Sequence, residues 1–127
     1  MDNFIKDIVT YTKTGNSNIL LTNYSSEIVN TLSFNTAIID VLSWLKLGYK
    51  REQWMKDKKY MKHKPLKINM DHTWCKILKE LVENDDRFSN YFTINDTAFD
   101  FKETISEEIR LESRKTAFNL YNPQMRK

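Results

Sequence analysis

The chain has 127 residues, of which 40% are hydrophobic and 29% are charged, and its formal net charge is +3. This composition is ordinary for a globular domain, too apolar for intrinsic disorder and too charged for a membrane span. Only 2 Gly and 2 Pro are present, which argues against Gly-rich phosphate loops and multi-turn β-sandwiches. We expect one domain over residues 1–127, of the mainly α or α+β class, with a small β-hairpin near residues 90–101.

The sequence carries no sign of export or membrane insertion. A single cysteine, Cys75, excludes an intramolecular disulfide. The first residues, MDNFIKDIVTYTK, lack the basic and apolar regions of a secretory signal. The longest apolar stretch, residues 37–47, is interrupted by Asp40, Ser43 and Lys46 and is too short to cross a bilayer. A cytoplasmic location and no membrane partner are therefore expected.

Two helices are predicted before the central part of the chain. Apolar residues recur at helical spacing over residues 4–12. Ser25 or Ser26 can cap a second helix over residues 27–32, which breaks around Ser33.

The clearest helix of the N-terminal half follows this break. Asn35 can cap it, and Gly48 stands where a left-handed C-terminal cap is expected. Ile39 and Trp44 are apolar but lie off the main stripe, so the helix is expected to be buried on more than one face. The main stripe, at i, i+3, i+4 and i+7, consists of Ile38, Val41, Leu42 and Leu45.

A helix, a strand and a second helix are predicted next. The helix covers residues 51–61 and ends before Pro65, because the residue before a proline disfavours helical backbone. Residues 66–70 alternate apolar and polar, which indicates a short strand. Asp71 then caps a helix whose apolar stripe has no gap and consists of Trp74, Ile77, Leu78, Leu81 and Val82.

A β-hairpin and a final helix complete the prediction. The β-prone runs at residues 91–94 and 98–101 flank Asn95, Asp96 and Thr97, a turn sequence. Thr104 and Glu107 form a capping box that opens the final helix, which runs toward Asn122.

The order strand, helix, hairpin over residues 66–101 resembles the back half of a winged helix, with the hairpin turn as the wing tip. A winged helix normally reads DNA with the helix before its hairpin. Here that helix offers only Lys76, Lys79 and His72 outward, and the wing is acidic. If nucleic acid binds, we expect residues 50–67 to carry the contact instead.

Charge is distributed very unevenly along the chain. Residues 46–67, called the basic segment here, hold nine Lys and Arg against two carboxylates, a local balance of +7. Residues 80–112 hold ten carboxylates against three cations, a local balance of −7. Such polarity steers association more than it stabilises a fold.

The basic segment also contains aromatic residues between its cations. Ammonium groups bind phosphate and exposed rings stack on unpaired bases, so this combination suits DNA or RNA. A solvated lysine-rich helix whose apolar residues pack on the core is the competing interpretation. The residues expected to bind nucleic acid are Lys50, Arg51, Trp54, Lys56, Lys58, Lys59, Tyr60, Lys62 and Lys64.

The alternative function is a non-enzymatic protein-binding module or inhibitor. The apolar stripe of the final helix is incomplete, and Leu111, Phe118 and Tyr121 could form a partner interface or a homodimer seam. Packing of these residues within the same domain is the other possibility. Twelve Asn and fifteen Lys against five Arg are typical of an AT-rich genome, which would suit a phage or mobile-element factor that docks on a host protein.

No constellation in the sequence favours catalysis. Cys75 and His72, with Asp71 and His63, could ligate zinc, but a second closely spaced pair is missing, and a buried structural cysteine is favoured. The adjacent carboxylates at residues 85–86 and 107–108 could each hold a magnesium ion. Glu107 and Glu108 point about 100° apart on a helix and cannot easily share one ion, and residues 85–86 fit a helix terminus followed by a solvated turn. We therefore expect no enzyme activity, catalytic residue, metal or cofactor.

Overall fold

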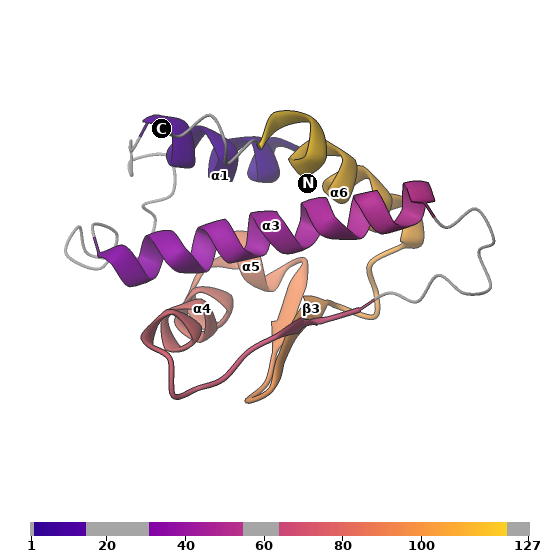
Figure 1. Cartoon of the computed structure of the whole chain (residues 1–127). Coiled ribbons are helices and arrows are strands. Elements are labelled where there is room, and N and C mark those ends of the chain that lie inside the picture. Colours follow the sequence, from indigo (N-terminus) through magenta and orange to yellow (C-terminus); the bar gives the residue numbers. More distant parts are fainter. Residues whose placement is uncertain (1, 15–30, 55–63, 122–127) are drawn as a thin grey trace.

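The computed structural model describes residues 2–14, 31–54 and 64–121, with the side chains of residues 4–14, 31–51 and 64–121. This part of the chain is mainly helical with a small antiparallel sheet, as predicted. The long helix α3 (Leu32–Trp54) crosses the middle of the molecule (Figure 1). Helices α1 (Asp2–Thr14) and α6 (Glu107–Leu120) lie on one side of α3. The other side holds α4 (Thr73–Asn84), α5 (Asp86–Ser89) and the sheet.

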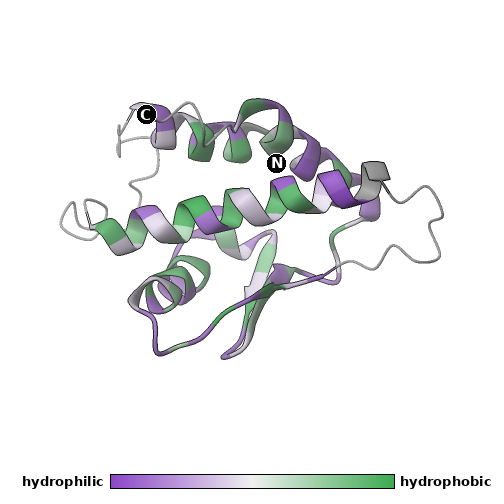
Figure 2. Cartoon of the chain, in the orientation of Figure 1, coloured by the Kyte–Doolittle hydropathy of each residue, from purple (hydrophilic) through white to green (hydrophobic). Residues whose placement is uncertain are grey.

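The apolar residues of α1 and α3 meet in the core, as their spacing predicts. Ile5 and Ile8 of α1 are fully buried, and so are Ile38 and Leu42 of α3. Green, apolar positions on these helices alternate with purple, polar ones along each ribbon (Figure 2). Because α3 has neighbours on both sides, it is buried on more than one face.

The start of α3 corrects the sequence prediction. The helix begins at Leu32, so it runs through Ser33 and Asn35, where a break was expected. Thr31 caps it, since its Oγ1 accepts a hydrogen bond from the Phe34 N–H at 3.1 Å. Asn35 lies inside the helix, and its side chain accepts a hydrogen bond from the Tyr11 hydroxyl of α1. The predicted helix over residues 27–32 falls outside the described residues, apart from its last two positions.

The prediction that Gly48 ends this helix is also wrong, because α3 continues to Trp54. Gly48 lies where α6 crosses α3, and a Cβ atom there would stand 2.9 Å from Cδ of Arg114. Arg114 is only 4% exposed. Its guanidinium carbon lies 5.7 Å from the Trp44 ring centroid and 5.4 Å from that of Phe101. The glycine is therefore required for close packing and not for a helix end. Of the helix predicted over residues 51–61, only residues 51–54 are described, as part of α3.

The sheet contains β1 (Leu66–Lys67), β2 (Phe92–Ile94) and β3 (Ala98–Phe101) in the order β1-β3-β2, with antiparallel pairing throughout. The predicted hairpin is confirmed: Phe92 pairs with Phe101 and Ile94 with Phe99. Its turn is held by Asn95, whose Oδ1 accepts from the N–H groups of Thr97 and Ala98.

Strand β1 is shorter than the predicted run over residues 66–70. The chain turns at Asn69, whose Oδ1 accepts from the Asp71 N–H at 2.9 Å and whose carbonyl accepts from the His72 N–H. This turn ends the strand and leads into α4. In the winged-helix comparison, β1 does pair with the hairpin, but the helix directly before the hairpin is the four-residue α5 and not α4.

Two predicted helix starts shift by one or two residues, and one helix start was not predicted. His72, and not Asp71, is the N-cap of α4, and its side chain makes no capping bond. Ser106, and not Thr104, caps α6 and accepts from the Ile109 N–H at 3.2 Å. Asp85, expected in a solvated turn, is 3% exposed; it caps α5 and pairs with Arg87 at 3.2 Å. The hydrogen bonds that Asp85 accepts compensate its burial.

Candidate functional site

The two described ends of the basic segment lie close together: residues 46–54 belong to α3, and residues 64–67 return beside that helix. A cavity of about 670 Å³ separates one face of α3 from residues 64–67. On α3, the lining positions recur three and four residues apart, as one helix face requires. These lining residues are Asp40, Ser43, Trp44, Leu47 and Arg51.

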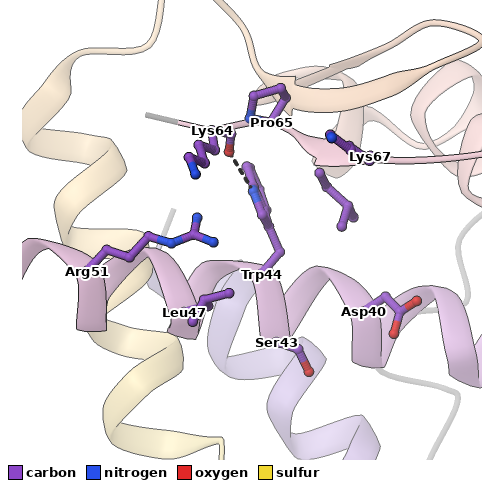
Figure 3. Close-up of a pocket in the computed structure, with 9 residues that line it drawn as sticks. Asp40, Ser43, Trp44, Leu47, Arg51, Lys64, Pro65 and Lys67 are labelled. Atoms are coloured by element: carbon purple, nitrogen blue, oxygen red, sulfur yellow. Dashed lines mark hydrogen bonds between the residues drawn. The ribbon is translucent and has the colours of Figure 1, made fainter. Parts of the chain in front are cut away.

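Trp44 fixes the distance between α3 and the returning chain. Its Nε1 donates a hydrogen bond to the Lys64 carbonyl oxygen at 2.8 Å (Figure 3). The indole ring is buried against Phe99 and Phe101, with ring centroids 5.6 and 5.4 Å apart. A side chain held by packing and a hydrogen bond gives the cavity a preformed wall.

Three cations line this cavity. Arg51 is half-buried, and Lys64 and Lys67 are exposed. None of the three takes part in an ion pair within residues 2–14, 31–54 and 64–121. Figure 3 shows the Arg51 and Lys64 side chains on the same side of the Trp44 indole, with Asp40 on the other. Two of the three cations therefore lie at one end of the cavity, and Lys67 lies on the Asp40 side of the indole.

Lys46 belongs to the basic segment but serves a different contact. Its Nζ donates to the Tyr121 carbonyl oxygen at 2.8 Å and lies 5.7 Å from the Phe118 ring centroid. Burial and the charge of Lys50 lower the pKa of Lys46. This lysine links α3 to the end of α6 and does not face the cavity.

Asp40 lines the end of the cavity away from Arg51, and burial raises the pKa of its carboxyl above the ordinary value. A raised pKa means that the protonated carboxyl stabilises the folded state relative to the ionised carboxylate. This stabilisation is lost as pH rises through the pKa of the carboxyl in the folded state. Asp40→Asn is therefore expected to raise the midpoint of urea unfolding at pH 7 and to change it little below about pH 3.

The exposed Asp71→Asn is the matched control for this substitution, and its unfolding midpoint is expected to stay the same at both pH values. An equal effect of Asp40→Asn at the two pH values would contradict the ionic explanation.

The predicted nucleic-acid-binding residues are only partly described. Lys50 is exposed on α3, Trp54 is the last residue of that helix, and Arg51 and Lys64 line the cavity. The remaining predicted residues lie outside the described part: Lys56, Lys58, Lys59, Tyr60 and Lys62.

The predicted partner residues of α6 divide into two groups. Tyr121 is 2% exposed and belongs to the core, so it is not available on a surface. Leu111 and Phe118 are half-buried, and the Phe118 ring packs on Tyr49 of α3 with centroids 4.8 Å apart. A partner interface at Leu111 and Phe118 stays a prediction.

No group of three potential metal ligands occurs within the described residues, which omit His63. Cys75 is fully buried, as the structural interpretation predicts. Its Sγ accepts from the Asn69 N–H at 3.4 Å, and burial raises the pKa of its thiol. A buried thiol of raised pKa holds the turn before α4 and is a poor nucleophile.

The sequence did not identify Asp40, Ser43 and Leu47 as neighbours of the basic residues. Their spacing from Arg51 along one helix face is the signal that could have found them. The missing information was that residues 64–67 return to this face.

A scan against protein-family models, a search of curated proteins and a search of solved structures each found no match to this chain. None of the helices in the described part of the chain is both long enough and apolar enough to span a bilayer.

Proposed function

We propose that this protein binds nucleic acid and contacts the phosphate backbone through the basic segment. The observation that supports the proposal most strongly is that Arg51, near the end of α3, and Lys64 and Lys67 line one cavity. In the sequence, four more lysines, at positions 56, 58, 59 and 62, stand between these two ends. A run of cations whose first and last members line the same cavity can present several charges to one stretch of phosphates.

The distribution of charge also favours an anionic partner. The ten carboxylates of residues 80–112 stand on α4, α5, the hairpin and α6, with the turns between them, and Lys79 of α4 forms an exposed ion pair with Asp96 at 3.7 Å. The cavity cations form no ion pair with the described residues. A polyanion is attracted by the basic segment and repelled by the carboxylates of residues 80–112.

The test is fluorescence anisotropy with labelled single-stranded and duplex DNA and RNA at several salt concentrations. We expect binding whose log affinity falls linearly with log salt, at a slope that implies about four or more phosphate contacts. Absence of binding to all four probes at about 50 mM salt would overturn the proposal. Affinity capture with the α6 surface variants Leu111→Lys and Phe118→Lys would then test the protein-binding alternative.

A further inference from the structure

The cavity beside α3 combines a cationic end with an apolar wall. Arg51 and Lys64 lie on one side of the Trp44 indole (Figure 3). Leu47 and Pro65 also line the cavity, and Leu47 is 46% exposed although it is a large aliphatic residue. A bare phosphate would contact the cations and leave this wall in water. The cavity therefore suits an anion that carries an apolar or flat group.

We infer that this cavity holds one unpaired nucleotide of a bound single strand, with its phosphate on Arg51 and Lys64 and its base against Leu47 and Pro65. The inference rests on the proposed function and specifies which form of nucleic acid the protein takes. The Arg51 guanidinium can donate two parallel hydrogen bonds to a phosphate, while the Lys64 ammonium acts as a point charge. The volume of about 670 Å³ lies within the range of sites that enclose small organic ligands.

Duplex nucleic acid cannot use this cavity without local opening. A base in a duplex is paired and stacked, and extracting it costs free energy that an unpaired base does not require. An unpaired base also has a free face to cover the apolar wall. The expected consequence is a preference for single strands that depends on the residues lining the cavity.

Arg51 and its neighbour Lys50 provide a matched pair of variants. Arg51 lines the cavity, whereas Lys50 is exposed on α3 and does not. Arg51→Gln and Lys50→Gln each remove one positive charge, so both weaken the general attraction to phosphate. In anisotropy titrations with a labelled 12-nucleotide strand and its duplex, we expect wild type to prefer the single strand by about tenfold. Arg51→Gln should lose most of this preference, and Lys50→Gln should retain it.

Leu47 tests the apolar wall without a change of charge. We expect Leu47→Ala to weaken single-strand binding about fivefold and duplex binding hardly at all. The control is Leu32→Ala, which truncates a leucine of the same helix that is 80% exposed and does not line the cavity. It should bind like wild type, and far-UV circular dichroism should show the same helix content in all four variants.

The possible failures are distinguishable. If wild type binds neither the single strand nor the duplex, the proposed function is overturned. Equal binding of both forms, or the same loss in Arg51→Gln and Lys50→Gln, would leave nucleic-acid binding intact and overturn the assignment of this cavity to an unpaired nucleotide.

Discussion

Replacing Lys56, Lys58, Lys59 and Lys62 together by glutamate is expected to abolish nucleic-acid binding. Each replacement changes the formal net charge by −2, so four of them take it from +3 to −5. Four cations that stand between Arg51 and Lys64 in the sequence become carboxylates, which repel phosphate instead of releasing its counterions. Anisotropy at about 50 mM salt, where electrostatic binding is strong, measures the loss.

A variant of equal charge separates local from global electrostatics. In this variant, four exposed lysines outside the basic segment are replaced by glutamate, so its formal net charge is also −5. We expect this control to retain measurable binding with a similar salt slope, because its local phosphate contacts are intact. Equal loss in both variants would show that net charge, and not the basic segment, controls binding. The four control positions are Lys6, Lys13, Lys76 and Lys115.

The second large effect is expected in the core, where Arg114 of α6 reaches across α3. Arg114→Ala should lower the free energy of unfolding by about 3 kcal/mol, since it leaves a cavity beside Trp44 and Phe101 and removes the cation from both ring faces. Arg114→Met keeps most of the buried volume and should recover part of the loss. Urea unfolding followed by circular dichroism gives both values.

Gly48 and Arg114 are expected to be strongly coupled. In the wild-type background Gly48→Ala should destabilise by about 1–2 kcal/mol, because its Cβ overlaps the Arg114 side chain. In the Arg114→Ala background the same change should stabilise by up to about 1 kcal/mol, which is the helix preference of alanine over glycine. A double-mutant cycle without this reversal of sign would show that the glycine is not required by Arg114.

Elements with a strong local pattern could be predicted from the sequence. The unbroken stripe of α4 and the turn residue Asn95 in the hairpin each determine the local structure, and the structure agrees. Gly48 was misinterpreted, because its role depends on Arg114, which is distant in sequence. The cap positions also shifted, since neighbouring polar residues such as Thr104 and Ser106 compete and the packing of the helix selects one of them.

The charge of the candidate site could be predicted from the sequence, but the shape of the site could not. Lys and Arg counts locate the basic segment directly. The cavity exists because the Trp44 indole donates to the Lys64 carbonyl, and a contact between residues twenty positions apart has no signature in helical periodicity. Leu47 therefore looked like an ordinary helix residue, and its exposure beside Arg51 became visible only in the structure.

The packing of α1 on α6 has a consequence for biosynthesis. These are the first and last helices described, and both cover the same side of α3 (Figure 1). While the ribosome is still translating residues 107–120, α1 and α3 lack the neighbour that shields them from water. Apolar side chains of both helices then stay accessible to chaperones and to other nascent chains until synthesis of α6 is complete. A ribosome stalled before Glu107 would consequently hold a chain prone to aggregation.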